Sequence, residues 1–240
     1  MKQQILQSFF DKNRSKTPQI PPLIESNANW IQNHSLIPYL PLLLNDVPYQ
    51  DMLREAQALD DLYVAHRSND SAGWSSLCIH GISSQHTDHY GVYPEYSHLT
   101  NDTVPYTWTE IADRCPVTVG YFRDRFPHDV YHRVRFMRLG PGGYILPHSD
   151  SPDRGLRATN FSLNNPDDCE FVFQDIGLVP YKDSGSAIML ANGYVHSIWN
   201  RSQQPRYHII VHGYATDSYL EFQDLLIKSY QSLVPMVVNV

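Results

Sequence analysis

The chain has 240 residues and a mass of 27.6 kDa, enough for one large domain or two small ones. Its 25 acidic residues outnumber its 18 basic ones, and the net charge of −7 argues against a protein that binds nucleic acid or membranes through a general basic surface. Three cysteines without CxxC spacing argue against a disulfide scaffold, whereas 12 histidines raise the question of a metal site.

The N-terminal region carries no pattern of a targeting or membrane segment. MKQQILQSFFDKNRSK lacks the apolar core and cleavage site of a secretory signal. No stretch of the sequence reaches the roughly 18–20 apolar residues that span a bilayer. We therefore expect a cytoplasmic protein, with neither a membrane nor a nucleic acid as its partner. The proline-rich TPQIPP at residues 17–22 predicts an extended arm.

The first half of the chain mixes a helix, a strand and a long loop. Residues 48–65 place apolar side chains at helical spacing and predict an amphipathic helix. Residues 74–79 read as a short strand. Residues 83–106 are rich in His, Tyr, Ser, Pro and Asn without clear periodicity, which predicts a long loop that could form part of a substrate mouth.

A capping box and a proline mark the end of this first half. Thr107 is followed three residues later by Glu110, the pattern that begins a helix. Pro116 breaks the middle of residues 107–126, so we expect two short helical pieces there. We expect a single domain over residues 1–240, in which residues 1–130 form a helical and loop buttress.

The second half changes character and reads as short β segments separated by turn residues. About eight strands follow one another at roughly ten-residue spacing, which is typical of a sandwich or barrel. The segments are HRVRFMRL, YILPHSD, RATNFSLN, CEFVFQD, LVPYKD, SAIMLA, YVHSIWN and RYHIIVHGYA. This pattern predicts a mainly β core over residues 131–216.

Two local signals add detail to the second half. The pair Asn192-Gly193 between two apolar runs predicts a hairpin, because a type I′ turn needs positive φ at both central positions. Residues 217–230 begin with an acidic cap and carry apolar residues at core positions. We expect residues 217–240 to form a C-terminal helix and tail.

One group of residues has the spacing of a metal site. His148 and Asp150 are two residues apart, so in a strand they point to the same face. His196 follows on a separate predicted strand just after the Asn192-Gly193 turn. Two imidazoles and one carboxylate occupy three positions of an octahedral metal and leave three open, as in non-haem Fe(II) oxygenases. We predict that His148, Asp150 and His196 are metal ligands and catalytic residues.

Arg206, ten residues after His196, begins the last predicted strand. A guanidinium group offers a fixed, bidentate fork for a carboxylate. Chelation of 2-oxoglutarate needs open metal positions and a cation for its far carboxylate. These residues supply both, so Arg206 is the predicted cosubstrate-binding residue.

With these residues in place, the stretch from about 132 to 215 resembles the Fe(II)/2-oxoglutarate-dependent dioxygenases, and within them the aspartyl/asparaginyl β-hydroxylase-like family, which includes free-proline hydroxylases. The resemblance implies a double-stranded β-helix of the jelly-roll, cupin-like kind with flanking helices. It implies a hydroxylase that uses Fe(II), 2-oxoglutarate and O2 and releases succinate and CO2. It also implies that Arg157, nine residues after His148, helps to hold a carboxylate of the cosubstrate or substrate.

The resemblance implies an amino-acid or peptide substrate, hydroxylated as a free amino acid such as proline or at an amino-acid side chain. The aspartyl hydroxylase that acts on protein domains has Gly where Asp150 stands, so Asp150 is more similar to the small-molecule branch.

Three alternatives stand beside this interpretation. A second HxD motif, His86-Thr87-Asp88, lies in the polar loop and lacks a flanking strand and a later histidine with an arginine ten residues on. A non-catalytic cupin-like barrel could hold a carboxylate ligand or a structural metal without turnover. A zinc hydrolase could use the same ligands and would be active without O2.

Overall fold

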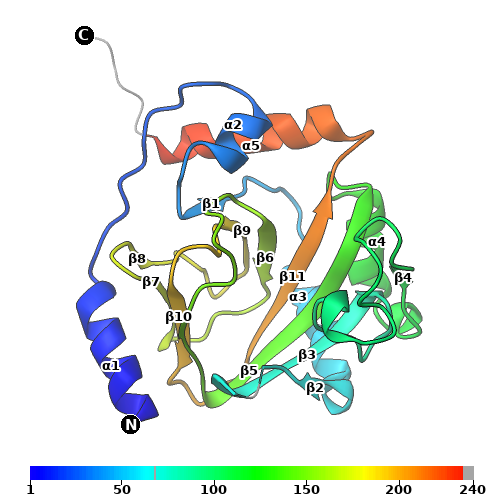
Figure 1. Ribbon diagram of the computed structural model, residues 1–240, viewed down its shortest axis with the longest axis horizontal. Coiled ribbons are helices and arrows are strands. Elements are labelled where there is room, and N and C mark those ends of the chain that lie inside the picture. The colour runs from blue at the N-terminus through cyan, green and yellow to red at the C-terminus, as the bar shows by residue number, and fades with distance from the viewer. Residues whose placement is uncertain (68, 235–240) are drawn as a thin grey trace.

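The computed structural model describes residues 1–67 and 69–234, and in these residues an antiparallel sheet of eleven strands is flanked by helices (Figure 1). The elements in chain order are α1 (Lys2–Asn13), α2 (Ala28–Asn33), β1 (Tyr39–Pro41), α3 (Tyr49–Ala58), η1 (Asp60–Leu62), β2 (Val64–Ala65), β3 (Ser71–Gly81), η2 (Tyr90–Val92), β4 (Thr107–Trp108), η3 (Ala112–Arg114), α4 (Pro116–Asp124), β5 (Val130–His148), β6 (Ala158–Ser162), β7 (Cys169–Phe173), β8 (Gly177–Leu178), β9 (Ser186–Leu190), β10 (His196–Asn200), β11 (Arg206–Tyr214) and α5 (Tyr219–Leu233).

The sheet curls because the long strand β5 belongs to both of its halves. Residues 130–139 of β5 pair with β11, and residues 144–148 pair with β10. One half therefore has the order β1-β9-β6-β11-β5 and the other has the order β5-β10-β7-β8. This arrangement is the mainly β, double-stranded β-helix expected from the sequence, and Figure 1 shows β5 running beside β11 before it turns toward β10.

The bend of β5 lies at the glycines that the sequence pattern treated as a turn between two strands. That division is wrong, because Gly140–Gly143 continue the strand. Gly142 has φ +69°, and a Cβ on Gly143 would lie 2.7 Å from the carbonyl oxygen of Gly140. Strand β3 pairs with both parts of β5 and bends with it at Gly73, where φ is +68°. The glycines therefore turn the strand from one half of the barrel into the other.

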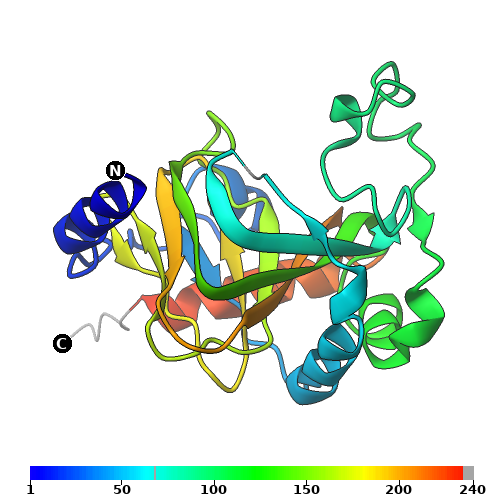
Figure 2. The same cartoon turned by 90° about the horizontal axis from the view of Figure 1, so that it is seen from below.

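Apolar side chains fill three separate regions around this sheet. The outer side of the half that contains β6, β9 and β11 packs against α2, α3, α4 and α5. The barrel interior holds a second cluster that includes Phe171, Phe173 and Ile198. Leu6 and Phe10 of α1 pack against Val172 on the outer side of the other half. In Figure 2, α1 and the segment 82–106 lie at opposite ends of the molecule.

Several sequence predictions in the first half agree with the structure. The predicted helix 48–65 is α3, which ends earlier, at Ala58, and is followed by a 3-10 turn. The strand predicted at 74–79 lies within β3, and residues 83–106 form a loop with one short 3-10 turn. The C-terminal helix predicted within residues 217–240 is α5, and residues 235–240 of the predicted tail lie outside the described residues.

The helix start predicted at Thr107 is wrong. Thr107 belongs to β4 and pairs with Gly81, because the strand partner offered by β3 outweighs the local capping pattern. The two short helical pieces expected in this region are η3 and α4. Pro116 is the first residue of α4, where the missing N–H costs nothing.

The hairpin predicted at Asn192-Gly193 is also wrong. The flanking strands β9 and β10 lie in different halves of the barrel and do not pair with each other. Neither residue of the pair has the positive φ that a type I′ turn requires. The connection therefore carries the chain between the two halves. No helix among the described residues combines the length and the apolar character needed to cross a bilayer.

Candidate metal centre

The three predicted metal ligands meet where β5 ends and β10 begins. His148 is the last residue of β5, His196 is the first residue of β10, and the two are register partners with ring centroids 4.4 Å apart. Asp150 lies two residues beyond the end of the strand, so strand parity alone does not place it. Its backbone N–H donates to the carbonyl of Asn192 at 2.9 Å, which ties the segment after β5 to the turn before β10.

Gly193 allows this tie because the two segments approach very closely. A Cβ at Gly193 would lie 2.0 Å from the carbonyl oxygen of Asp153. No larger residue fits without a shift of one backbone against the other. The glycine of the Asn-Gly pair therefore positions Asp150 and His196 relative to each other.

Each histidine is held with its Nε2 atom toward the carboxylate of Asp150. The Nδ1 atoms of His148 and His196 lie 2.8 and 2.9 Å from the carbonyls of Leu146 and Tyr194, so each Nδ1–H donates there and Nε2 keeps its lone pair. The Nε2 atoms lie 3.5 and 3.8 Å from the carboxylate oxygens of Asp150. Backbone carbonyls fix metal-binding histidines in this way in known centres.

The electrostatics of the three groups suit a cation. Burial, followed by the neighbouring His148, lowers the pKa of His196 to about 4, so its ring is neutral near pH 7. Burial raises the pKa of Asp150, but hydrogen bonds from His148 and Arg67 and the charges around it outweigh burial and hold that pKa well below its usual range. Burial lowers the pKa of His148, whereas the hydrogen bond to Asp150 raises it, and the net direction is upward. The carboxylate is therefore ionised beside the neutral ring of His196.

Among the described residues, His148, Asp150 and His196 form a group of three His, Cys, Asp or Glu side chains that are close enough to share a metal ion. One nitrogen or oxygen from each of His148, Asp150 and His196 lies within 4.8 Å of the others. Two imidazole nitrogens and a carboxylate oxygen are the donor set of a non-haem Fe(II) centre. The residues present therefore fit such an ion.

Arg206 forms a second polar position inside the barrel. Its side chain is 1% exposed, and its Nη2 atom has no hydrogen-bond partner among the described residues. Nε donates to Asn165 at 3.1 Å, Nη1 lies 3.3 Å from Nδ1 of His208, and the guanidinium lies 4.7 Å from the ring centre of Tyr181.

Tyr181 was not anticipated from the sequence. Its buried hydroxyl also has no hydrogen-bond partner among the residues described, and burial raises the pKa of that hydroxyl. An unpaired N–H beside an unpaired O–H suits a bound carboxylate, because each buried donor otherwise carries a desolvation cost. Arg206 and Tyr181 thus fit the far carboxylate of a dicarboxylic acid.

Aromatic rings connect this position to the predicted ligands. The ring of His196 lies 5.3 Å from that of Phe171, which lies 6.1 Å from Tyr181. All three rings belong to the barrel interior or pack against it. Phe171 therefore lies between His196 and the Tyr181 that stacks on Arg206.

Arg157 lies elsewhere. Its side chain is exposed, forms an ion pair with Asp153 and lines a small cavity together with His128 and Gly213. It precedes β6 at a position where the next residue, Ala158, takes the inward place. The structure therefore does not bring Arg157 to the predicted ligands.

Arg67 is a further residue at the site. Its Nη1 atom donates to Oδ1 of Asp150 at 2.6 Å. It follows the short strand β2 with φ +46° and is separated from Asp150 by 83 positions. No local pattern marks it, so only the fold reveals it.

The second HxD motif is not a metal site. His86 contacts Ser83 and lies 3.6 Å from Glu95. Asp88 lies 3.5 Å from His66. The two members of the motif therefore have different partners.

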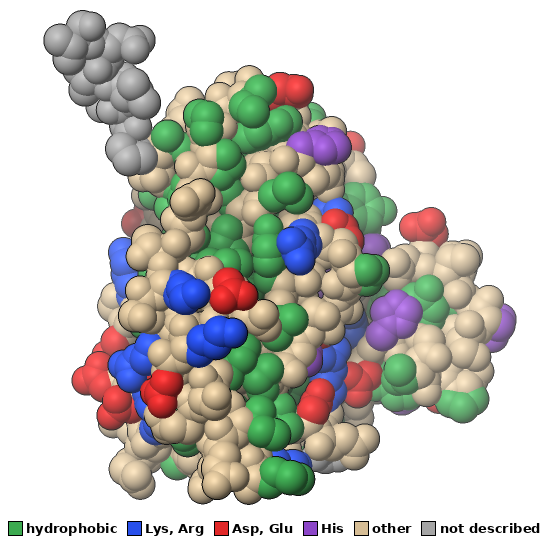
Figure 3. Space-filling model, turned by 60° about the vertical axis from the view of Figure 1, so that its left-hand side comes forward, with side chains coloured by type: hydrophobic (Ala, Val, Ile, Leu, Met, Phe, Trp, Pro, Cys, Tyr) green, Lys and Arg blue, Asp and Glu red, His purple; other side chains and the backbone are tan. Residues whose placement is uncertain are grey.

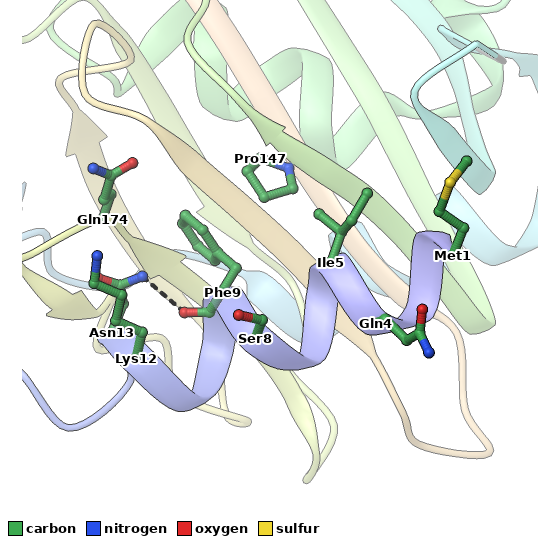
Figure 4. Close-up of a pocket in the computed structure, with 9 residues that line it drawn as sticks. All are labelled: Met1, Gln4, Ile5, Ser8, Phe9, Lys12, Asn13, Pro147 and Gln174. Carbon is green, nitrogen blue, oxygen red and sulfur yellow. Dashed lines mark hydrogen bonds between the residues drawn. The ribbon is translucent and has the colours of Figure 1, made fainter.

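A groove of about 570 Å³ lies beside α1 on the outer side of the barrel, close to Pro147 (Figure 4). Ile5, Phe9 and Lys12 contribute to its walls, and a hydrogen bond from Asn13 to the carbonyl of Phe9 closes one turn of the helix. None of its lining residues is a His, Asp, Glu or Cys. The groove therefore offers no imidazole, carboxylate or thiolate ligand for a metal.

Comparisons with known proteins agree with this picture. A model of the family described as aspartyl/asparaginyl beta-hydroxylase matches residues 48–215. No curated protein matches the chain.

Three solved structures illustrate the distant likeness in fold. A prolyl-4-hydroxylase from Pseudomonas putida is 12% identical, with a TM-score of 0.42 over 74% of this chain and 91% of that one. A prolyl hydroxylase from Trichoplax adhaerens, in complex with a peptide fragment of hypoxia inducible factor, is 13% identical, with a TM-score of 0.40 over 76% and 85%. The non-heme alpha ketoglutarate dependent epimerase SnoN from nogalamycin biosynthesis is 13% identical, with a TM-score of 0.41 over 78% and 82%.

Proposed function

The chain belongs to the aspartyl/asparaginyl beta-hydroxylase family of Fe(II)- and 2-oxoglutarate-dependent dioxygenases, and on that premise we propose that it hydroxylates an unactivated C–H bond of a free amino acid or of an amino-acid side chain. The matched residues 48–215 include all of the predicted ligands. The reaction consumes substrate, 2-oxoglutarate and O2 and yields the hydroxylated product, succinate and CO2.

The observation that carries the proposal is the convergence of two imidazole nitrogens and one ionised carboxylate at the junction of β5 and β10. In the proposal, His148, Asp150 and His196 hold Fe(II). The bound metal with 2-oxoglutarate and O2 supplies the oxidising chemistry. The protein holds the ligands rigidly, since each imidazole is anchored to a backbone carbonyl.

We assign the far carboxylate of 2-oxoglutarate to Arg206. This guanidinium is buried, has an unpaired nitrogen and lies beside the unpaired hydroxyl of Tyr181. Arg157 is exposed and already paired with Asp153, so it has neither property. A buried cation of fixed geometry selects a dicarboxylic acid and orients its other end.

The interior apolar side chains keep water from the reacting centre. Phe171 and Phe173 pack within 5.3 and 5.6 Å of the His196 ring, and His196 itself is 4% exposed. Exclusion of water protects a strongly oxidising centre from side reactions.

The test is succinate release from the purified protein supplied with Fe(II), 2-oxoglutarate and O2, measured with free amino acids and short peptides. We expect a basal rate without substrate, a higher rate with the true substrate, and a product heavier by one oxygen atom. Asp150→Ala removes a ligand and is expected to abolish both rates.

The matched control is His86→Ala, which alters the other HxD motif and is expected to keep both rates. Full activity of Asp150→Ala would refute the assignment of ligands. A complete absence of iron binding and of 2-oxoglutarate consumption would favour a non-catalytic binding barrel, and activity without O2 would favour a hydrolase.

A further inference from the structure

A group of cationic side chains lies on the barrel interior beyond the predicted metal ligands. Arg133 and Arg135 alternate with apolar residues on β5 and so share its inward face with His208 and His212 of β11. Arg135 is 6% exposed, and its Nε atom has no hydrogen-bond partner among the described residues. Within those residues, no carboxylate lies at ion-pair distance from Arg133 or Arg135.

Arg135 connects to the predicted metal ligand Asp150 through a series of contacts and one peptide bond. Arg135 donates from Nη1 to the carbonyl of Thr87 at 2.5 Å. The hydroxyl of Thr87 lies 3.4 Å from Nδ1 of His66. The next residue, Arg67, donates to Asp150. These contacts therefore connect Arg135 to Asp150, one of the predicted metal ligands.

The histidines of this region do not add to its charge. Burial and the surrounding arginines lower the pKa of His66 to about 3. Burial, followed by the neighbouring arginines, also lowers the pKa values of His208 and His212 well below the usual range. Burial lowers even the pKa of Arg135, to about 9, which leaves its guanidinium charged at neutral pH.

A count of charges shows that this side of the barrel lacks an anion. A divalent metal, Asp150, 2-oxoglutarate and Arg206 together sum to zero. Arg67, Arg133 and Arg135 then face the two carboxylates of Asp70 and Asp88, which leaves an excess of one positive charge. The whole chain has a net charge of −7, and basic and acidic side chains are interspersed on the face in Figure 3. The excess is therefore a local property of the interior.

A buried cation without a partner is costly, so a fold retains it where a ligand supplies the missing charge. We propose that Arg67, Arg133 and Arg135 form the binding site for a carboxylate of the substrate, and that the substrate is net anionic. It is a dicarboxylic amino acid, or a carboxylate whose amine is blocked, free or within a peptide. A zwitterionic amino acid such as proline brings no net charge and leaves the excess unbalanced.

This inference rests on the proposed function and narrows its substrate. It also gives the segment 82–106 a role, because the carbonyl of Thr87 and the rings of Tyr93 and Tyr106 lie around Arg133 and Arg135. The base of that segment therefore forms one wall of the substrate site.

The first experiment compares charged and uncharged members of substrate pairs by succinate release above the basal rate. The pairs are aspartate against asparagine, N-acetylproline against proline, and short peptides that contain Asp against the same peptides with Asn. We expect the net-anionic member to be favoured by about ten- to a hundredfold in kcat/KM, the usual size of a charge-assisted hydrogen bond. The free and peptide arms distinguish the two sources of the carboxylate.

Arg135→Met is expected to bring the ratio of kcat/KM between the charged and uncharged members of each pair toward one. The control is Arg138→Gln, because Arg138 lies on the same strand but faces outward toward Asp60. Equal or better use of the uncharged member by a protein with normal basal turnover would overturn the inference alone. Loss of basal turnover in the wild-type protein would instead count against the proposed function.

A second experiment needs no turnover and uses malonate as the anion. In the metal-free Arg206→Met background, malonate is expected to raise the Tm in a saturable way, and additional Arg135→Met is expected to abolish that rise. Without malonate, Arg135→Met is expected to raise the Tm, because it removes an unpaired buried charge. If Arg135→Met lowers the Tm and leaves the response to malonate unchanged, the role of Arg135 is the structural contact with Thr87, and the inference is overturned.

Discussion

The two faces of strands β5 and β11 carry different sets of side chains. The outward face presents apolar residues that pack under the helices, and these are Val134, Phe136, Tyr207, Ile209 and Val211. The inward face carries imidazoles and most of the arginines of these strands beside apolar residues. Its polar members are Arg133, Arg135, Arg206, His208 and His212, and its apolar members include Met137, Leu139 and Ile210. Over residues 133–136 of β5, a shift of one residue therefore moves from an outward side chain that stabilises the fold to an inward arginine that is buried at some cost in stability.

The largest expected effect on activity is that of a substitution at His148, the C-terminal residue of β5. His148→Ala removes an imidazole ligand, and we expect 2-oxoglutarate turnover to fall roughly a thousandfold, about 4 kcal/mol in activation free energy. The Tm of the metal-free protein should change little. Turnover and thermal unfolding measured on the same preparation check both statements. A strong decrease in the Tm of His148→Ala together with its loss of activity would contradict the separation of stability and activity between the two faces.

A loss of stability without a loss of activity is expected at Phe136, which follows Arg135 and lies on the outward face of β5. Phe136 is fully buried under the helices, and Phe136→Ala should lower the free energy of unfolding by about 3–5 kcal/mol. The KM for 2-oxoglutarate should stay near the wild-type value in the fraction that remains folded. Denaturant titration and steady-state kinetics test this pair of outcomes. A cost below about 1 kcal/mol would mean that the outward face does not carry the core.

Much of this contrast follows from the sequence because strand parity is a local property. The alternation in RYHIIVHGYA predicts the two faces of β11, and the spacing of His148, Asp150 and His196 indicates one site. The position of Asp150 itself depends on its hydrogen bond to Asn192, because Asp150 lies beyond the end of β5. Parity also separates Arg133 and Arg135 from Val134 and Phe136, although the sequence does not say which face is inward.

Contacts between residues that are far apart in the chain could not be predicted from the sequence. Arg67 reaches Asp150 across 83 positions, and Tyr181 reaches Arg206 from a segment without any motif. The Gly140–Gly143 bend and the turn at Asn192-Gly193 look like hairpin signals locally. Their true roles, a bend shared by two half-barrels and a crossing between them, depend on partners that are distant in the chain.

A comparison of Arg206 with Arg157 tests which arginine binds the far carboxylate of 2-oxoglutarate. We expect Arg206→Met to raise the KM for 2-oxoglutarate by about ten- to a hundredfold, because a charge-assisted contact with the far carboxylate is lost. The KM for substrate should not follow. Arg157→Met is the matched variant, and its KM for 2-oxoglutarate should match that of the wild type. An increase at Arg157 equal to that at Arg206 would restore the assignment that the family resemblance implied for Arg157.

The smallest expected effect is a pH dependence of stability on the outer side of the sheet. Burial lowers the pKa values of His80 and His128 to about 4. Their unfolded forms take up a proton below about pH 6.5 while the folded forms stay neutral, so stability is complete above that pH and falls as the pH drops toward 4. Each histidine contributes a slope of about 1.4 kcal/mol per pH unit in that window.

Denaturant titrations between pH 7 and 4 measure this slope. His128→Gln should reduce it, whereas His34→Gln, at an exposed position, should leave it unchanged. A slope that is unaffected by His128→Gln would place the source of any acid lability elsewhere.

The most direct test of the account is an anaerobic Fe(II) titration of the metal-free protein in the presence of 2-oxoglutarate, followed by calorimetry. We predict one tightly bound Fe(II) per chain in the wild type and in His86→Ala, and no tight binding in His196→Ala, whose fold should be intact by thermal unfolding. Tight Fe(II) binding that survives in His196→Ala, or no tight Fe(II) binding in the wild type, would contradict the claim that the metal centre lies where β5 ends and β10 begins.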